Sequence, residues 1–414
     1  MLKLTKTKLI KGVKNIHMQE NMSILDIINE NCPDGVEYKK LGTIGKFYGG
    51  ITGKSKKDFS NGNAKFITYK NVYDNNAINF NVTDKVKIGK DECQNTLQYC
   101  DVCFTGSSET PDECGLSSVV TEIPKENMYL NSFCFFFRFN DTSNVNPLYL
   151  KHLFRSQNLR EQINKTAQGV IRFNVSKKRM ENVIIPLPPL TIQTEIAKIL
   201  DQFEELEKEL EKELKMRIDQ YEYYRNMLLS FDDNVEKKKL KDISDITIGE
   251  FIRKDKQQDT GYPVYNGGID NTGFYNDFNK NGTYILISAR GANAGYVNRF
   301  QGKYWAGNSC YSISVINQNI NWKYVYYYLK KYQIDLMDNQ TKGGIPSISK
   351  KQVEDIEIPI PSIEVQKSIV ETLDQFDELC TSLTNGIPAE IEMRKEQYEY
   401  YRNLLLNFKN INEQ

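Results

Sequence analysis

The sequence has almost no histidine, no net charge and no long apolar run. Its only histidines are His17 and His152, so a histidine general base has little support. No run reaches the roughly 18 apolar residues of a membrane span. The 54 basic and 54 acidic residues cancel, which excludes a uniformly basic, non-specific binder of nucleic acid. Eight irregularly spaced cysteines favour reduced thiols in a cytosolic protein over a disulfide scaffold.

Two patterns that could indicate a chemical site fail on their spacing. Residues 49–55, Gly-Gly-Ile-Thr-Gly-Lys-Ser, resemble a phosphate-binding loop, but Tyr48 stands where its first glycine belongs. The cysteines between residues 93 and 114 lack the second Cys-x2-Cys pair that a structural zinc site uses. Buried free thiols are the better interpretation. The sequence therefore predicts no catalytic residue and no metal site in this chain.

A long stretch of the sequence occurs twice. Residues 185–231 return near the C-terminus, and the block Gln220–Asn226 (Gln-Tyr-Glu-Tyr-Tyr-Arg-Asn) is identical to Gln397–Asn403. Leu-Asp-Gln-Phe likewise occurs at 200–203 and at 373–376. Chance does not produce both matches in the same order, so the chain is a tandem duplication.

Both copies of the repeat predict helices. Apolar residues recur at steps of three and four, the pattern of an amphipathic helix. They are Ile192, Ile196, Ile199, Leu200, Phe203, Leu206, Leu210 and Leu214 in the first copy and Ile369, Leu373, Phe376, Leu379 and Leu383 in the second. The first copy predicts a continuous helix over 190–231, whereas Asn-Gly-Ile-Pro at 385–388 predicts two helical pieces in the second. An antiparallel helix pair is the simplest way to bury both apolar seams.

The segments outside the repeat form two related blocks. Each begins with Lys-Lys-Leu, at 39–41 and at 238–240, and each has Ser-Lys-Lys before a proline-rich stretch. Short β-branched and aromatic runs between Asn-Gly and Gly-Gly turns predict mostly β structure with one or two helices per block. The predicted fold class is α+β, a tandem duplication of two mostly β domains separated by two long helices packed as an antiparallel coiled coil. The predicted boundaries are a basic tail over 1–22, domains over 23–185 and 235–358, and helical regions over 186–234 and 359–414.

Two similar blocks on two long helices suggest two recognition domains held at a fixed distance from each other. A helix over 190–231 would be about 60 Å long at 1.5 Å per residue. That length corresponds to roughly 18 base pairs of duplex at about 3.4 Å each. Double-stranded DNA with two short targets at a fixed gap is therefore the partner that we expect.

The repeated residues resemble a known family. Pro-x-Pro at 186–188 and 359–361, Leu-Asp-Gln-Phe and Gln-Tyr-Glu-Tyr-Tyr-Arg-Asn are similar to the conserved regions of the DNA specificity subunit of type I restriction-modification systems. The stretch Cys32–Leu41 resembles the start of that family's first target-recognition domain. These matches frame residues 22–408 in the family's order.

The resemblance implies a division of labour between subunits. Each block would be a target-recognition domain that reads one half of a bipartite, gapped DNA site. Two modification (methyltransferase) subunits would dock on the helical regions, and restriction (translocase and nuclease) subunits would join them. S-adenosylmethionine, ATP and Mg²⁺ would then be cofactors of the partners, and this chain would be non-catalytic, would bind no cofactor and would work in the cytoplasm in phage defence. The sequence agrees, because it contains no Asn/Asp-Pro-Pro-Tyr/Phe loop of the amino-methyltransferases.

The residues that contact DNA are expected in local basic clusters of the two blocks. Lysines mostly meet phosphates, whereas arginine, asparagine and glutamine side chains read base edges. The candidates are Lys54, Ser55, Lys56, Lys57, Gln168, Arg172, Asn174, Lys177 and Lys178 in the first block and Arg253, Arg290, Asn293, Lys342 and Lys350 in the second. The alternative for each is an ordinary solvated surface residue.

The candidates for partner binding lie in the repeated tyrosine block, because tyrosine and arginine are typical of interface hot spots. They are Tyr221, Tyr223, Tyr224, Arg225, Tyr398, Tyr400, Tyr401 and Arg402. Tyr221 and Tyr224 could instead close the core of the helix pair. Two other functions stay open: a coiled-coil scaffold that binds proteins and not DNA, and an orphan or decayed specificity subunit.

Overall fold

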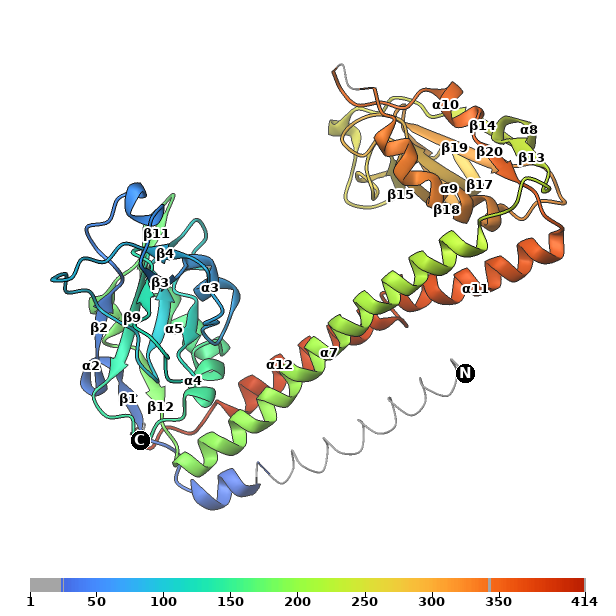
Figure 1. Ribbon diagram of the computed structural model, residues 1–414. Coiled ribbons are helices and arrows are strands. Elements are labelled where there is room, and N and C mark those ends of the chain that lie inside the picture. Colours follow the sequence, from blue (N-terminus) through green and yellow to red (C-terminus); the bar gives the residue numbers. More distant parts are fainter. Residues whose placement is uncertain (1–23, 25, 342–343, 413–414) are drawn as a thin grey trace. The chain divides into compact units, whose positions relative to one another are not determined.

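The computed structural model describes residues 24, 26–341 and 344–412 (Figure 1). The basic tail predicted over 1–22 and the candidate Lys342 lie outside the described residues. The chain divides into two compact units, Met1–Glu209 with Glu392–Gln414, and Leu210–Ile391. Each unit contains one of the two blocks together with parts of the long helices. None of the described helices is both long enough and apolar enough to cross a membrane.

The first block is built on an antiparallel sheet in the order β2-β9-β5-β7. Its strands are β2 (Gly45–Gly49), β9 (Cys134–Phe139), β5 (Val102–Thr105) and β7 (Ser117–Val119). Two smaller sheets are β4 (Lys85–Val86), β3 (Ala64–Ile67) and β8 (Tyr129–Leu130), and β10 (Ala167–Gln168), β11 (Phe173–Val175) and β6 (Ser107–Ser108). β1 (Tyr38–Lys40) pairs with β12 (Ile184–Pro186), which brings the two ends of the block together.

The first block has more short helices than the one or two that were expected. They are α2 (Leu41–Ile44), the 3-10 helix η1 (Lys56–Phe59), α3 (Tyr69–Asp74), α4 (Pro147–Leu153), α5 (Gln157–Asn164) and α6 (Lys177–Met180). Side chains of Thr68, Asn146 and Ser176 cap α3, α4 and α6. A capped helix of one or two turns has too few residues to show a period, so the sequence pattern does not separate it from a turn.

The second block repeats this plan with a larger sheet, β14-β19-β17-β18-β15-β16. The strands are β14 (Ser244–Ile248), β19 (Cys310–Val315), β17 (Lys280–Ser288), β18 (Val297–Ala306), β15 (Tyr262–Tyr265) and β16 (Phe274–Tyr275). Its helices are α8 (Leu240–Ile243), η2 (Lys254–Lys256), α9 (Trp322–Asp338) and α10 (Lys350–Glu354). β13 (Lys237–Lys239) pairs with β20 (Glu357–Pro359), as β1 does with β12. The predicted domain boundaries at 185 and 358 fall in β12 and β20.

The duplication extends to single hydrogen bonds. The hydroxyl of Tyr149 on α4 donates to the carbonyl oxygen of Pro186 at 3.2 Å, and the hydroxyl of Tyr324 on α9 donates to that of Pro359 at 2.7 Å. These tyrosines therefore occupy the same place in the two blocks, and residues on either side of them can be compared directly.

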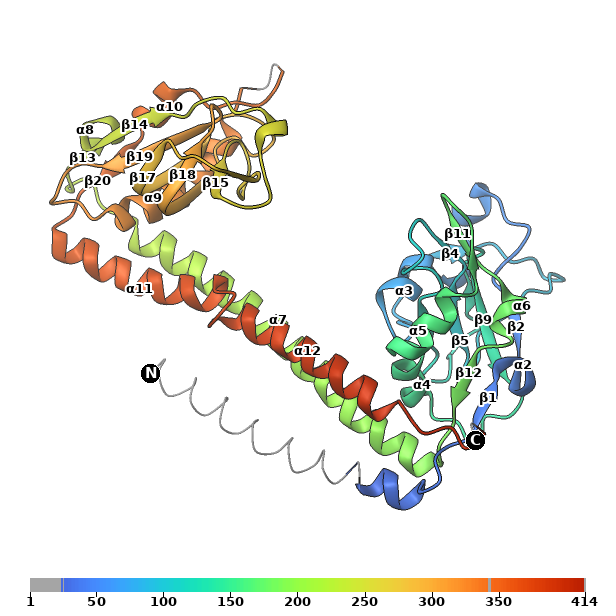
Figure 2. The ribbon, with the colours of Figure 1, turned by 180° about the vertical axis from the view of Figure 1, so that it is seen from behind.

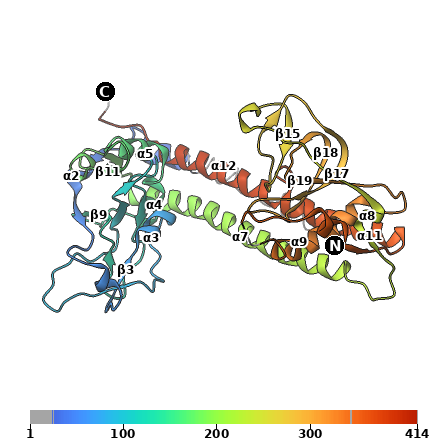
Figure 3. The same cartoon turned by 90° about the horizontal axis from the view of Figure 1, so that it is seen from above.

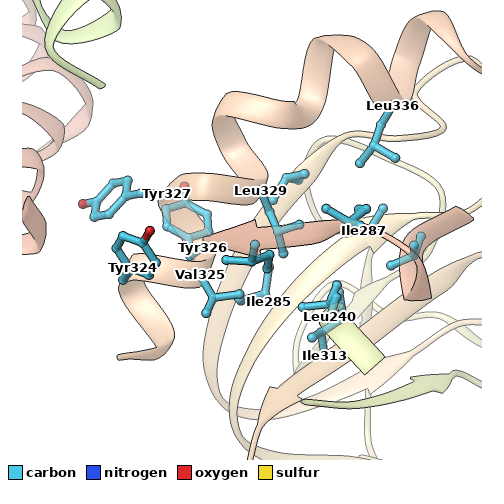
Figure 4. Packing of buried hydrophobic residues seen from close by; sticks show 14 of the residues in the cluster. Leu240, Ile285, Ile287, Ile313, Tyr324, Val325, Tyr326, Tyr327, Leu329 and Leu336 are labelled. Atoms are coloured by element: carbon cyan, nitrogen blue, oxygen red, sulfur yellow. The ribbon is translucent and has the colours of Figure 1, made fainter. Parts of the chain in front are cut away.

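The core of the second block lies between α9 and the sheet (Figure 4). Val325, Leu329 and Leu336 of α9 pack over Ile285 and Ile287 of β17. In the first block, α4 lies against β7, and its buried side chains share one apolar cluster with Phe135 and Phe137 of the aromatic strand β9. Burial of these side chains, each contributing about 1.5–3 kcal/mol, orients the start of α4 and of α9 toward the long helices.

The long helices are α7 (Leu190–Leu228), α11 (Ile363–Thr381) and α12 (Ile387–Leu405), and Figures 2 and 3 show α7 beside the other two. In the first unit Phe203 stacks on Tyr401 and Lys395 pairs with Glu207, so α7 and α12 run antiparallel. In the second unit Tyr224 stacks on Phe376 of α11. The predicted continuous first helix and interrupted second copy are both confirmed.

One part of the predicted apolar seam is wrong. Leu383 was expected to continue the stripe of the second copy, but its side chain is 83% exposed. The reason is that α11 ends at Thr381, and Ser382 adopts an extended backbone conformation. Leu383 therefore lies in the turn before α12, where helical spacing no longer places it over the seam.

Candidate functional site

Three of the predicted base-reading residues lie together on one hairpin of the first block. β10 and β11 are antiparallel with Gln168 opposite Asn174, and Asn174 also lies opposite Ser107 of β6. The hairpin encloses a five-residue loop, 169–173. Gly169 begins this loop with φ 142°, and a Cβ there would lie 2.0 Å from the carbonyl oxygen of Arg172. Only glycine fits this turn, so the sequence Gln-Gly determines where the loop closes.

The guanidinium of Arg172 is held at the side of this loop. Its Nε and Nη2 donate to Oγ of Ser107 at 3.2 and 3.1 Å, and it lies 5.9 Å from the ring centre of Phe133. Lys177 and Lys178 follow on α6, and both are exposed. The loop is thus bordered by exposed cations, with Arg172 held in one orientation.

The second block builds a loop at the same position. Arg290 lies opposite Ser347 in an antiparallel bridge, and the amide of Thr341 donates to the carbonyl oxygen of Ser347 at 3.1 Å. The amide of Ile348 donates to Ala289, as that of Val175 does to Gly106, both at 2.9 Å. Residues 344–346 therefore correspond to residues 171–173, while residues 342 and 343 lie outside the described residues. The two loops place the candidates Arg290 and Arg172 beside equivalent strands.

The other DNA candidates divide into paired and exposed side chains. Lys54 forms an ion pair with Glu92 at 2.5 Å, and the amide of Gly89 together with Lys54 lowers the pKa of Glu92 to about 2. Ser55 caps η1 and bonds to Asp58. In the second block Nε and Nη2 of Arg253 donate to the carboxylate of Asp255, at 3.1 and 2.9 Å.

Three more DNA candidates are exposed and one is partly covered. Lys56 and Lys57 are exposed on η1. Lys350 is exposed on α10 with an ion pair of 3.3 Å to Glu354. Asn293 is half-buried in the turn after Arg290, where its carbonyl oxygen accepts from the amide of Tyr296. None of these residues belongs to loop 169–173 or to residues 344–346.

Most of the repeated tyrosine block holds the helix pair together. Phe203 and Tyr401 stack with ring centres 5.3 Å apart, and Tyr224 and Phe376 with centres 5.4 Å apart. The equivalent arginines lie over equivalent rings, Arg225 over Tyr221 at 5.5 Å and Arg402 over Tyr398 at 5.1 Å. The core position that was considered for Tyr221 and Tyr224 is what the structure shows.

The remaining tyrosine of each copy faces solvent. Tyr223 is 65% exposed and Tyr400 63% exposed. Large exposed side chains also stand seven residues before and four residues after each of them: Met216 and Met227 in the second unit, and Met393 and Leu404 in the first. Such spacing places each set of three on one helical face. We call these sets the two apolar stripes.

A buried polar cluster connects the first block to α7. His152 of α4 bonds through Nε2 to Asp201 at 2.7 Å and through Nδ1 to the hydroxyl of Tyr398 at 2.8 Å. The ammonium of Lys151 bonds to Asp201 at 2.7 Å and to Glu204 at 2.9 Å. The oxygens and the ring nitrogen are close enough to ligate a metal. Since the Lys151 ammonium already bridges the two carboxylates, the cluster is complete without one.

Burial and hydrogen bonding set the charges of this cluster. Burial lowers the pKa of His152 below its ordinary value, which favours the neutral ring. Burial alone would raise the pKa of Asp201, but hydrogen bonds from His152 and Lys151 bring it below its ordinary value. The cluster is therefore a docking point between helices and offers no accessible acid or base.

The second unit has a corresponding cluster made of different residues. Lys323 and Tyr327 of α9 bond to Asp374 at 2.5 and 2.6 Å, and Arg299 of β18 bonds to Asp377 at 2.5 Å. Sequence reasoning missed both clusters. The aspartate of the repeated Leu-Asp-Gln-Phe could have indicated Asp201 and Asp374, whereas nothing in the sequence indicated their partners.

Among the described residues, no three of the cysteines that could have suggested a zinc site come close enough together to hold a metal ion. All four are free thiols, and Cys100, Cys103 and Cys114 are buried while Cys93 is exposed. Burial raises the pKa of Cys100 to about 12. The burial of Cys100, Cys103 and Cys114 agrees with the interpretation as buried free thiols, whereas Cys93 is exposed.

The chain matches the model of the type I restriction modification DNA specificity domain twice, over residues 33–220 and 232–393. It is 34% identical over 250 residues to a type I specificity subunit of Mycoplasma pneumoniae (57% of this chain, 90% of that one). It is 33% identical over 264 residues to the type I restriction enzyme EcoR124I/EcoR124II specificity subunit of Escherichia coli (56% and 65%). The crystal structure of the type I restriction-modification S subunit from M. genitalium covers 90% of this chain and 96% of its own, with TM-score 0.54 and 17% identity, which shows a shared fold.

Proposed function

Since the chain belongs to the family of type I restriction-modification DNA specificity subunits, we propose that each of its blocks reads one half of a bipartite, gapped DNA site. The observation that carries this proposal is the repeated loop. Residues 171–173 and 344–346 lead into equivalent backbone pairings, and the candidates Arg172 and Arg290, which lie at these pairings, are both exposed. Arginine is the side chain that most often reads guanine in the major groove. Different residues on the same frame would give the two half-sites different sequences.

Affinity for the phosphate backbone would come from lysines beside these loops. Lys177 and Lys178 follow the first loop, and Lys350 follows the second. Lys56 and Lys57 lie exposed on η1. Because the chain has no net charge, its attraction to DNA would be local, and each phosphate contact would add to the salt dependence of binding.

The two apolar stripes would each bind one modification subunit. The stripes carry equivalent residues in the two copies of the repeat, so two identical partners can make the same contacts twice. Methionine and tyrosine are enriched at such interfaces. Restriction subunits would join this core, and the complex would act in the cytoplasm, where its DNA lies.

Chemistry would belong to the partners. Methyl transfer from S-adenosylmethionine and ATP-dependent, Mg²⁺-requiring cleavage would take place in the modification and restriction subunits. The buried state of His152 supports this division, because both of its ring nitrogens are already hydrogen-bonded. The chain itself would supply recognition and spacing.

The direct test is co-expression with the methyltransferase encoded beside this chain. The complex should contain two modification subunits per chain, and single-molecule sequencing of host DNA should show methylated adenines in one gapped motif. Methylation at no defined motif, from a complex that assembles, would refute the recognition role.

A further inference from the structure

The loop of the first block ends in two branched apolar side chains. Val170 is 92% exposed and Ile171 89% exposed, more than any other large hydrophobic residue that the structure describes. They are adjacent in the chain and stand at the tip of the β10–β11 hairpin. Two such side chains in water gain nothing for the fold, so their exposure points to a contact with a partner.

The tip is held by the residues at its base. Gln168 pairs with Asn174, and Gly169 allows a turn that no side chain would fit. The guanidinium of Arg172 is bonded to Ser107, which is far away in sequence. The thiol of Cys114 also donates to the carbonyl oxygen of Phe173 at 3.4 Å. A loop held in this way binds without first losing much conformational freedom.

An exposed aliphatic residue recurs in the loop of the second block. Ile345 is 66% exposed, and Gly344 before it has φ 120°. The amide of Gly291 donates to the carbonyl oxygen of Pro346 at 2.9 Å, which holds this side of the loop against the residue after Arg290. The two blocks share little sequence here, and Ile345 stands two residues before Ser347 as Arg172 stands two residues before Asn174, yet both loops present an exposed aliphatic side chain.

Positive charge lies beside both tips in the chain. Arg172 is part of the first loop and Lys177 and Lys178 follow it, whereas Arg290 lies opposite Ser347 and Lys350 comes shortly after Ser347. Cations beside an apolar point are complementary to duplex DNA, where phosphates flank the bases. In a groove, apolar side chains meet thymine methyl groups or press between base steps.

We propose that Val170 and Ile171 in the first block, and Ile345 in the second, pack directly against the bases of their half-sites. Arg172 and Arg290 then act as the polar readers beside these apolar contacts. The inference rests on the proposed function, which it deepens by naming specificity residues that carry no hydrogen-bonding group.

The test is the double variant Val170→Ser with Ile171→Ser, in the full complex with modification subunits. On a duplex with the mapped motif, affinity should fall roughly tenfold to a hundredfold, as expected for lost apolar burial. On a duplex with the first half-site scrambled, affinity should change less than about twofold, and the salt dependence should stay the same, because no phosphate contact is removed. Ile123→Ser, in the same block and 77% exposed, is the matched control and should change neither affinity.

Three outcomes would overturn the assignment. Retained affinity for the motif would show that the tip does not touch bases. An equal loss on both duplexes would make it a general contact. Loss of the modification subunits without DNA would make it a protein contact. The wild-type complex separates this inference from the proposed function. If the wild-type complex does not bind the motif more tightly than the scrambled duplex, the proposed function is wrong. If it does, and the double variant shows the same preference, only the assignment of the loop tip is wrong.

A second experiment identifies the chemical groups of the DNA that the loop tip contacts. Deoxyuridine in place of each thymine of the first half-site removes the methyl groups, and 2-aminopurine there reports unstacking by its fluorescence. Either weaker binding to the uracil duplex or brighter 2-aminopurine supports the contact, provided that the double variant abolishes the effect. Neither change with the wild-type complex would contradict it.

Discussion

The hydroxyl of Tyr327 donates a 2.6 Å hydrogen bond to the carboxylate of Asp374. His152 bonds to Asp201 at 2.7 Å at the equivalent place in the first unit. Each block is therefore joined to its long helix through the aspartate of Leu-Asp-Gln-Phe, but by a tyrosine in one unit and by a histidine in the other.

Removal of the Tyr327 hydroxyl should destabilise the second unit. Tyr327→Phe keeps the ring but removes the hydrogen bond to the Asp374 carboxylate, which is worth about 1.5–3 kcal/mol, together with the longer bond of 3.5 Å that the hydroxyl accepts from Arg299. Trp305 and Trp322 are the only tryptophans of the chain, and both lie in this unit. The midpoint of urea unfolding, measured by tryptophan fluorescence, should thus shift to a lower urea concentration. Tyr328→Phe is the control, because no described residue bonds to that hydroxyl; equal shifts in both variants would contradict the prediction.

The first unit should lose stability as pH falls from 7.5 to 5.5. Burial lowers the pKa of His152 in the folded state, so the unfolded chain takes up a proton first, at a pH near the ordinary value of about 6.5. The stability that depends on neutral His152 is therefore fully present above that pH and is lost as the pH falls below it. A limit of pH 5.5 keeps the carboxyls of Asp201 and Glu204 largely ionised in both states, since their folded pKa values are lowered.

Pulse proteolysis in urea at each pH, with fragments assigned to the two units by mass spectrometry, measures this loss. His152→Gln can still donate to Asp201 but does not titrate in this range, so its first unit should lose less stability on acidification. Equal pH dependence in wild type and variant would show that His152 is not the titrating group.

The exposed tyrosines should control how many modification subunits bind. Tyr223→Ala or Tyr400→Ala alone should leave complexes with one modification subunit, and the double variant should leave none at micromolar concentration. Loss of a hot-spot tyrosine costs about 2 kcal/mol or more, which is roughly thirtyfold in affinity. Mass photometry measures the stoichiometry. Tyr99→Ala, 43% exposed in the first block, should retain both partners, and a double variant that still binds two would disprove this docking surface.

Two arginines of the second block should differ in their effect on sequence preference. Arg290 lies opposite Ser347, next to residues 344–346, whereas the guanidinium of Arg253 already donates to Asp255. Arg290→Ala should weaken binding to the cognate site by about 1–3 kcal/mol and reduce the base preference at one position of a single half-site. Arg253→Ala should leave the motif unchanged. The methylated motif of each complex, mapped on host DNA, decides between these outcomes, and relaxation of both half-sites by Arg290→Ala would contradict one block per half-site.

The helical part of the fold was predictable because helical periodicity is local. Ile192, Ile196 and Phe203 are buried as their spacing predicted, and Asn-Gly-Ile-Pro interrupts the second copy where glycine and proline disfavour a helix. The spacing also extended the seam to Leu383, and there it was wrong, since a period does not show where a helix stops.

The candidate site was predictable in composition but not in arrangement. Residue type indicates Gln168, Arg172 and Asn174, and the structure places them on one hairpin. It does not indicate Val170 and Ile171, because apolar residues in a β-like run are ordinarily core. Their exposure follows from the turn at Gly169 and from the pairing of β11 with β6, which no local pattern reveals.

The sequence by itself determined the duplication, the long helices and the family resemblance, since identity and periodicity are properties of neighbouring residues. Only the tertiary structure decided which tyrosines of Gln-Tyr-Glu-Tyr-Tyr-Arg-Asn stack inside the helix pair and which face solvent. It also decided that Asp201 and Asp374 receive different partners. These choices depend on packing between segments far apart in the chain, where burial and hydrogen bonding, and not local periodicity, set the free energy.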